Sequence, residues 1–72
     1  MAYDYAKLKG RIVEKVGTQR RFADLLGISE HTLSCKLNNR AAWTQSEIDR
    51  SCELLQLPPD SIVAYFFAHN VQ

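Results

Sequence analysis

The stretch GISEHTLSCKLNN, residues 27–39, carries polar side chains at the spacing of one face of a helix. Its serine is suited to cap that helix, and Leu33 and Leu37 are spaced to face a core. The opposite face would then present Glu30, His31, Ser34, Cys35 and Asn38. Such hydroxyl, imidazole and amide groups bind base edges and phosphates, or polar groups on another protein. The chemistry predicted for this stretch is therefore recognition, not catalysis.

Four residues in and before this stretch are spaced as in two helices that cross closely. Gln19, Ala23, Gly27 and Leu33 are separated by four, four and six positions. A residue as small as Ala23 lets another helix pass close by, and Gly27 permits a tight turn between two steeply inclined helices. Gln19 lies at a helix start, where free backbone N–H groups bind phosphate. The pattern predicts a helix-turn-helix unit over about residues 18–38, with its second helix in the major groove of DNA.

The charged residues of this unit have two interpretations. Arg20 and Arg21 open the first helix of the pair, where positive charge opposes the helix dipole. Their position favours a function, such as contact with phosphate or with an acidic protein surface, and the alternative is that both are merely solvated. The negative charge of Glu30 suits the positive start of the second helix dipole. Near DNA, its carboxylate would accept a hydrogen bond from a cytosine amino group, but phosphates would repel it. Glu30 therefore leaves a protein partner as open as DNA.

These motifs resemble those of the Cro/C1-type (XRE-like) helix-turn-helix regulators of bacteria and temperate phages. The resemblance covers about residues 11–57 and is carried by GTQRRFADLLGISEHTLSCKLNN and WTQSEIDRSCELLQL. The run TLSxKLN, followed by an aromatic residue, a capping threonine and xxEI, looks especially like short phage regulators encoded beside a lysogeny repressor gene, modulators of repression among them. The family implies five helices, operator binding, and frequent homodimers or contacts with a partner repressor.

The resemblance also implies roles for individual residues. Gln19 matches a phosphate-contacting glutamine, and Asn38 matches a phosphate-contacting position after the recognition helix. Two residues depart from the pattern, because Lys36 stands where many relatives have an apolar core residue and Asn39 replaces the usual glycine. The candidate DNA-binding or repressor-binding residues are Gln19, Arg20, Arg21, Ser29, Glu30, His31, Ser34, Cys35, Asn38 and Arg40.

The rest of the chain divides into short helices. A first helix fits between Asp4, as its cap, and Gly17, with Gly10 marking close packing inside it. Thr44 and Glu47 form a capping box for a fourth helix, and the LPPD motif ends it and starts a fifth. No segment shows the alternation of a strand. The positions expected in or over the core are Tyr5, Leu8, Ile12, Val16, Phe22, Ala23, Leu26, Leu33, Leu37, Trp43 (between the third and fourth helices), Ile48, Cys52, Leu55, Ile62, Tyr65 and Phe66. The fold class predicted is all-α, with five short helices in a lambda-repressor-like helix-turn-helix bundle.

Charge is distributed unevenly along the chain. Residues 7–40 hold eight Lys and Arg against three Asp and Glu, a net +5, whereas residues 41–72 hold one against four, a net −3. A basic front suits an anionic partner such as nucleic acid, although a net +5 is modest enough to be a set of solvated charges.

Length and composition exclude several classes of function. Seventy-two residues make one domain, 1–72, and no apolar run reaches the roughly 20 residues of a membrane span. The start MAYDYAKLKG lacks a secretory signal, so we expect a cytoplasmic protein with Cys35 and Cys52 reduced, and the resemblance implies that it is encoded by a phage and acts in a bacterial host. His31 and His69 are far apart, and no nucleophile or phosphate-loop signature occurs. We therefore expect no metal site, cofactor, small-molecule substrate or enzymatic activity.

Two functions are predicted. The first is a small phage-type transcriptional regulator of a lysogeny/lysis switch that binds double-stranded operator DNA through its third helix. The second is an anti-repressor or modulator that forms a protein complex with the DNA-binding domain of a partner phage repressor. The aromatic tail residues Tyr65, Phe66 and Phe67 close the core or form the seam of a homodimer.

Overall fold

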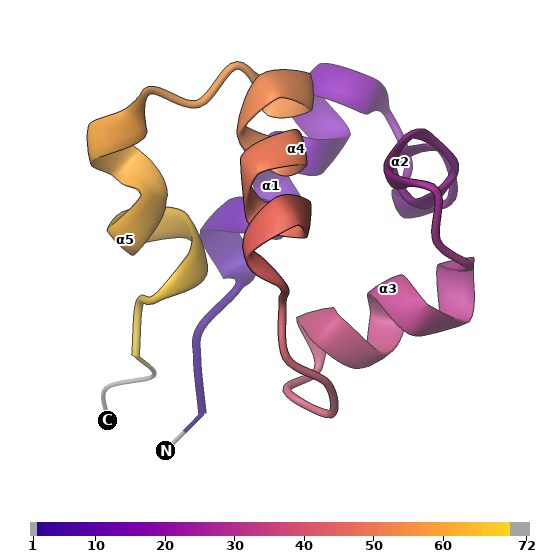
Figure 1. Cartoon of the computed structure of the whole chain (residues 1–72), viewed down its shortest axis with the longest axis horizontal. Coiled ribbons are helices and arrows are strands. Elements are labelled where there is room, and N and C mark those ends of the chain that lie inside the picture. The colour runs from indigo at the N-terminus through magenta and orange to yellow at the C-terminus, as the bar shows by residue number, and fades with distance from the viewer. Residues whose placement is uncertain (1, 70–72) are drawn as a thin grey trace.

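Five α-helices follow one another in the computed structural model, which describes residues 2–69 (Figure 1). The helices are α1 (Ala6–Val16), α2 (Gln19–Leu26), α3 (Glu30–Leu37), α4 (Gln45–Leu55) and α5 (Ile62–Phe66), with a 3-10 turn, Pro59–Ser61, before α5. Within residues 2–69 the only β-type pairing is an isolated bridge between Tyr3 and His69. The prediction of an all-α fold with five helices is confirmed.

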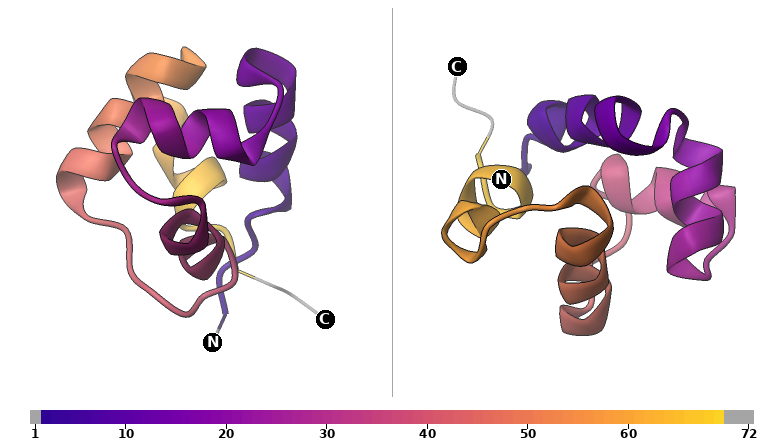
Figure 2. Two further views of the ribbon diagram at one scale, coloured as in Figure 1. Left: turned by 90° about the vertical axis from the view of Figure 1, so that its right-hand side faces the viewer. Right: turned by 90° about the horizontal axis from the view of Figure 1, so that it is seen from above.

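Helices α1 and α4 form the centre of the bundle. Helix α1 packs against α2, α4 and α5, whereas α3 packs mainly against α2. In Figure 1, α2 and α3 lie on one side of the central pair and α5 lies on the other. The left panel of Figure 2 turns the side with α2 and α3 toward the viewer. The two helices singled out by the sequence therefore occupy one side of the molecule.

The core consists of apolar side chains that the helical spacing predicts. Its buried members are Tyr5, Leu8, Ile12, Phe22, Ala23, Leu33, Leu37, Leu55, Leu57 and Phe66. The predicted core residues Val16, Leu26, Ile48, Cys52, Ile62 and Tyr65 are half-buried and pack against this cluster. Each fully buried Leu, Ile or Phe side chain contributes about 1.5–3 kcal/mol relative to an exposed one. On α4, Ser51 is fully buried, and its hydroxyl donates to the Glu47 carbonyl at 2.7 Å.

The helix starts and stops follow the local sequence closely. The Thr18 hydroxyl accepts from the Arg21 N–H at 3.1 Å and caps α2. The capping box of Thr44 and Glu47 at α4 is complete, because each residue's side chain accepts from the other's backbone N–H. Gly27 ends α2 with φ +80°, a conformation that costs other residues about 1–2 kcal/mol. The predicted capping box at Thr44 and Glu47 and the predicted turn at Gly27 are confirmed.

Three local predictions are wrong. Tyr5, not Asp4, occupies the cap position of α1, although the Asp4 carboxylate does accept from the N–H of Ala6, the first residue of the helix, at 2.9 Å. A Cβ on Gly10 would meet nothing within 4 Å, so this glycine marks no close packing. The Trp43 ring contacts Phe66 edge-on at 5.1 Å between centroids. Trp43 therefore covers the core toward α5 instead of between α3 and α4.

The C-terminal end of α4 is closed by side chains of α1. Gln56, the residue after the helix, has φ +55°, a left-handed conformation that favours glycine. The Arg11 guanidinium donates to the carbonyls of Leu55 at 3.0 Å and Gln56 at 3.2 Å. The Lys15 ammonium donates to the Gln56 side chain at 3.0 Å. Cations bonded to terminal carbonyls complement the negative end of a helix dipole.

The N-terminal arm is tied to the loop after α3. The Tyr3 N–H donates to the Asn39 side-chain oxygen, and the Asn39 amide nitrogen donates to the Tyr3 carbonyl, both at 2.9 Å. On the other side of the arm, the Asp4 N–H donates to the Ala68 carbonyl at 2.7 Å. Asn39 has φ +63°, which fits its predicted place at a glycine-like stop. The arm therefore joins the end of α3 to the segment after α5.

Candidate functional site

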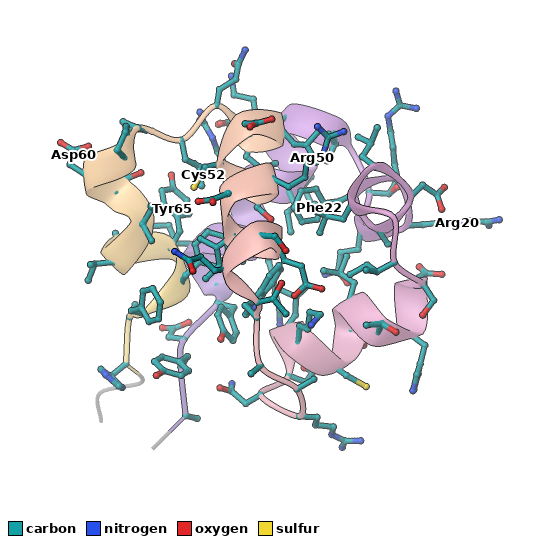
Figure 3. The ribbon with its side chains drawn as sticks, in the orientation of Figure 1. Arg20, Phe22, Arg50, Cys52, Asp60 and Tyr65 are labelled. Carbon is teal, nitrogen blue, oxygen red and sulfur yellow. The ribbon has the colours of Figure 1, made fainter. Side chains whose placement is uncertain are left out.

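The first turn of α2 presents two arginines to solvent. The Thr18 cap fixes this turn, and Phe22 anchors it because its ring is completely buried. Arg20 and Arg21 are exposed, whereas Gln19 is half-buried. Figure 3 shows Arg20 pointing away from the body of the molecule and Phe22 pointing toward α4. The two guanidinium groups are therefore free to contact a partner.

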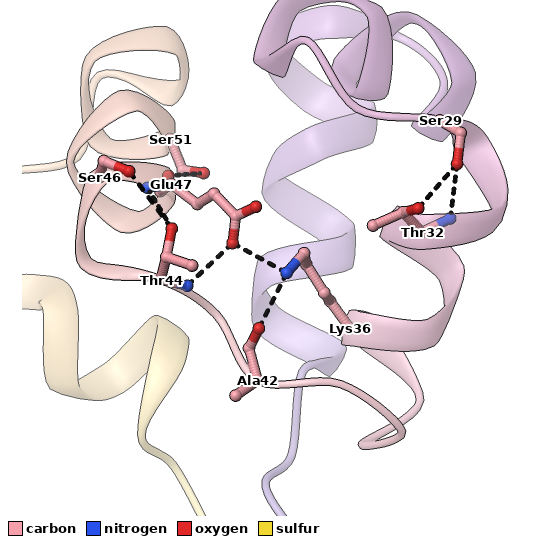
Figure 4. Close-up of polar contacts among 8 residues, drawn as sticks. All are labelled: Ser29, Thr32, Lys36, Ala42, Thr44, Ser46, Glu47 and Ser51. Atoms are coloured by element: carbon pink, nitrogen blue, oxygen red, sulfur yellow. Dashed lines mark hydrogen bonds and ion pairs between the residues drawn. The ribbon is translucent and has the colours of Figure 1, made fainter.

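The outer surface of α3 is polar. Ser29 caps the helix, accepting from the Thr32 N–H at 3.0 Å and donating to the Thr32 hydroxyl at 2.8 Å (Figure 4). Leu33 and Leu37 are buried, as predicted, so the opposite side of the helix faces outward. Of the predicted residues on that side, Glu30, His31 and Asn38 are exposed and Ser34 and Cys35 are half-buried. We call these residues, with Gln19, Arg20, Arg21, Ser29 and Arg40, the α2–α3 face.

Neighbouring side chains on α3 are paired with one another. The Cys35 sulfur lies 3.6 Å from His31 Nε2, and the Asn38 side-chain amide donates to the Ser34 hydroxyl at 3.3 Å. Both pairs are four residues apart, the spacing at which side chains meet on a helix surface. These contacts restrict the rotamers of the outer side chains before any partner arrives.

Lys36, which stands where Cro/C1-type regulators often have an apolar residue, is an interior residue. Its side chain is buried, and its ammonium donates to the Ala42 carbonyl at 2.8 Å. The same ammonium forms an ion pair with Glu47 Oε1 at 2.9 Å, as Figure 4 shows. The methylene groups of Lys36 fill the position where an apolar side chain is expected, and its ammonium pairs with Glu47 in the first turn of α4. The sequence prediction did not include this pair, although a lysine beside two inward-facing leucines is a signal for it.

One carboxylate oxygen of Glu47 contacts two donors. Its Oε1 accepts from the Lys36 ammonium and from the Thr44 N–H, the latter at 2.8 Å. Burial alone would raise the pKa of the Glu47 carboxyl, but the Thr44 N–H and the Lys36 ammonium outweigh it. The pKa therefore lies below its ordinary value, and Glu47 is ionised at neutral pH.

Arg40 completes the α2–α3 face from the loop that follows α3. Its backbone N–H donates to the Cys35 carbonyl at 2.8 Å, which closes the end of the helix. Its side chain is exposed. The hydrogen bonds between Asn39 and Tyr3 hold the neighbouring residue, so the loop that carries Arg40 is anchored on both sides.

The net charge of this surface is small. Lys36 counts toward the basic front in the sequence, but Glu47 neutralises it inside the protein. Other cations of the front belong to α1, where Arg11 pairs with Glu14 at 2.6 Å and Lys7 lies over the Tyr65 ring. The exposed charges on α2, α3 and the following loop are Arg20, Arg21, Asp24, Glu30 and Arg40. Three arginines against two carboxylates leave one net positive charge, with His31 counted as neutral.

Neither cysteine takes part in a disulfide. Cys35 lies on α3 and Cys52 on α4, and both are free. Burial raises the pKa of the Cys52 thiol, and the nearby Asp49 carboxylate adds to the rise. Within residues 2–69, no three His, Cys, Asp or Glu side chains are grouped as metal ligands. None of the described helices is long and apolar enough to cross a membrane.

Known proteins match this chain over nearly its whole length. The family described as "Protein of unknown function (DUF739)" matches residues 1–69. Among solved structures, the solution structure of the modulator of repression (MOR) of the temperate bacteriophage TP901-1 from Lactococcus lactis has a TM-score of 0.81 and 46% sequence identity. The alignment covers 100% of this chain and 97% of that chain. A comparison with curated proteins gave no significant match.

Proposed function

We infer the function of this chain from the premise that it belongs to the DUF739 family and shares its fold with a phage modulator of repression. We propose that it is itself a modulator in a phage genetic switch. In this proposal it acts by forming a complex with the DNA-binding domain of a phage repressor, and it is not an enzyme. The observation that carries the proposal is the 46% identity over the full chain.

This identity extends beyond the apolar core. A shared fold alone does not imply a shared function. However, 46% of 72 residues is about 33 positions. The buried core and the hydrophobic residues packed against it number 10 and 9 among the described residues, or 19 together. At least about 14 identical positions must therefore lie outside this apolar set, and those among them that are not helix caps, turns or buried polar residues support a shared partner.

The charge of the α2–α3 face also favours a protein over DNA. Non-specific DNA affinity comes mainly from Lys and Arg side chains that displace counterions from phosphates. Within this face Glu30 offsets one of the three exposed arginines, and Asp24, an exposed carboxylate one helical turn after Arg20 on α2, offsets a second. A surface of mixed charge with polar groups between is suited to the polar, DNA-reading surface of another protein.

We assign the docking to the α2–α3 face. Arg20 and Arg21 would contact carboxylates or carbonyls of the repressor, and the outer side chains of α3 would contact its polar groups. Occupying the repressor's DNA-binding domain would compete with operator DNA or change its affinity. Direct operator binding by α3 is the second candidate, supported by the two exposed arginines at the start of α2 and by the polar outer surface of α3.

One titration distinguishes the two candidates. The chain, the phage repressor encoded beside it and labelled operator DNA from the same regulatory region are mixed in pairs and together. We expect the chain and the repressor to elute as one complex in gel filtration, and the repressor's operator occupancy to change when the chain is added. If the chain alone shifts the operator at low salt and forms no complex with the repressor, direct DNA binding replaces the proposal.

Point variants test the α2–α3 face. Arg20→Ala and Arg21→Ala should each weaken the repressor complex by about 5- to 30-fold, the range for arginines that anchor an interface. Lys7→Ala is the matched control, because it removes an exposed cation near Tyr65 of α5, on the other side of the bundle. Equal effects of the three substitutions would place the interface elsewhere. Circular dichroism of each variant confirms that the fold is retained.

A further inference from the structure

A groove with an apolar floor lies between the N-terminal arm, the loop after α3 and helices α4 and α5. It consists of two adjoining hollows of about 590 and 440 Å³. Both hollows are lined by Trp43, Ile48 and Phe67, which therefore form the middle of the groove. Volumes of this size are typical of ligand sites, which are mostly apolar with a few placed polar groups.

The groove has opposite charges at its two ends. Among the residues that the structure describes, Arg40 is the only charged one that lines the larger hollow, and Asp49 is the only one that lines the smaller. Both side chains are exposed, and neither forms an ion pair with another described residue. An occupant that fits both ends must carry an anion near Arg40 and a cation near Asp49.

The walls of the groove are fixed in advance and leave apolar surface in water. Asn39 holds Tyr3 through two backbone hydrogen bonds, and Phe66 packs edge-on against Trp43. Phe67 nevertheless remains 43% exposed. Preformed walls reduce the conformational entropy lost on binding, and covering an exposed aromatic ring stabilises a complex.

We propose that this groove binds a short amphipathic segment of another protein, with an apolar anchor residue flanked by one acidic and one basic side chain. The apolar middle takes the anchor, while Arg40 and Asp49 fix the two flanks. Nucleic acid does not meet this requirement, because the groove offers a single cation. The groove and the α2–α3 face share Arg40, but Asp49 and Phe67 belong to the groove alone, so the proposal can be tested apart from the proposed function.

Trp43 allows binding to be measured directly. It is the chain's only tryptophan and lines both hollows, so its fluorescence reports occupancy of the groove. The probes are three peptides that share one leucine anchor and differ only in the flanking residues, which are one Glu and one Lys, two Glu, or two Lys. We expect the mixed peptide to bind about two- to fivefold more tightly than either other peptide, within the range for exposed ion pairs.

Two substitutions should each change which of the three peptides binds most tightly. Arg40→Glu makes both ends acidic and should favour the peptide with two lysines. Asp49→Lys makes both ends basic and should favour the peptide with two glutamates. Both side chains are exposed, so the fold should be retained, and thermal unfolding checks this. Because Asp49 lies outside the α2–α3 face, Asp49→Lys should leave the repressor complex unchanged, which separates a failure of this proposal from a failure of the proposed function.

Three results would overturn the proposal. The first is an unchanged Trp43 emission with all three peptides at millimolar concentration. The second is binding that does not depend on the charge of the peptide in the wild-type chain and in both variants. The third is self-association in analytical ultracentrifugation that Arg40→Glu abolishes, because the groove would then bind a second copy of the chain.

Discussion

The ammonium nitrogen of Lys36 lies 2.9 Å from a carboxylate oxygen of Glu47, and this oxygen also accepts from the N–H of Thr44. One atom of α4 therefore holds the position of α3 and closes the capping box at its own helix start. This link therefore adds to the packing of Leu33 and Leu37 in holding α3, and with it the α2–α3 face, against the rest of the bundle.

Replacing Lys36 should destabilise the fold. Lys36→Ala leaves the Glu47 carboxylate and the Ala42 carbonyl without their donor, and it removes the buried methylene groups. We expect a loss of about 2 kcal/mol, between the values for exposed and fully buried pairs, in urea unfolding. Arg50→Ala is the control, because its pair with Glu53 is exposed and 3.6 Å long. A loss below about 0.5 kcal/mol for both variants would contradict the structural role of Lys36.

The lowered pKa of Glu47 predicts a pH dependence of stability. The unfolded carboxyl has the ordinary value near 4.5, whereas the folded one titrates at lower pH. As the pH falls below about 4.5, the unfolded state therefore binds more protons and the contribution of Glu47 is progressively lost. Melting temperatures between pH 7 and pH 3 should decrease more for the wild type than for Glu47→Gln, which lacks this proton uptake. Parallel curves would contradict the prediction.

Two glycines should respond in opposite ways to alanine. Gly10 lies in the middle of α1 with nothing within 4 Å of an added Cβ, so Gly10→Ala should stabilise the fold by about 0.4–1 kcal/mol. An added Cβ on Gly27 would also meet nothing within 4 Å, but φ is +80° there, which alanine rarely adopts. Gly27→Ala should therefore destabilise the fold by about 1–2 kcal/mol. Thermal unfolding of the two variants measures both signs. Stabilisation by both would show that the backbone at position 27 relaxes without cost.

Asn39 combines a backbone and a side-chain role that two substitutions separate. Asn39→Gly keeps the left-handed conformation but removes both hydrogen bonds to Tyr3, whereas Asn39→Ala loses both features. Hydrogen exchange at the Tyr3 amide should accelerate in both variants. The free energy of unfolding should decrease more for alanine, by about 1 kcal/mol. An unchanged exchange rate would mean that the arm is held without Asn39.

The predictable part of this fold is local. The caps at Thr18, Ser29 and Thr44 and the stop at Gly27 follow from residue type and from contacts within a few positions. The helical spacing of apolar residues identified most of the core for the same reason. Gly10 was misinterpreted, because a glycine inside a helix gives no local indication of whether another helix passes close to it.

The contacts that the sequence did not predict join distant segments. Lys36 was recognised as unusual, but its partner Glu47 depends on how α3 crosses the start of α4. Trp43 was assigned to the wrong neighbours because its direction is set by the loop that carries it. The outward direction of the α3 side chains was predictable from Leu33 and Leu37. The partner of that surface was not, because a serine or histidine on a helix suits DNA and protein alike.

The arginine that closes the C-terminal end of α4 has a consequence for the order of folding. Arg11 and Leu55 are 44 positions apart, so this closure cannot form until a long loop of chain has been organised. A peptide containing α4 alone would keep the local closure, in which the Leu57 N–H donates to the Cys52 carbonyl at 2.9 Å, but would lack the arginine contacts. We therefore expect the arginine contacts to form late in folding, and their opening in the native state to report on the docking of α1.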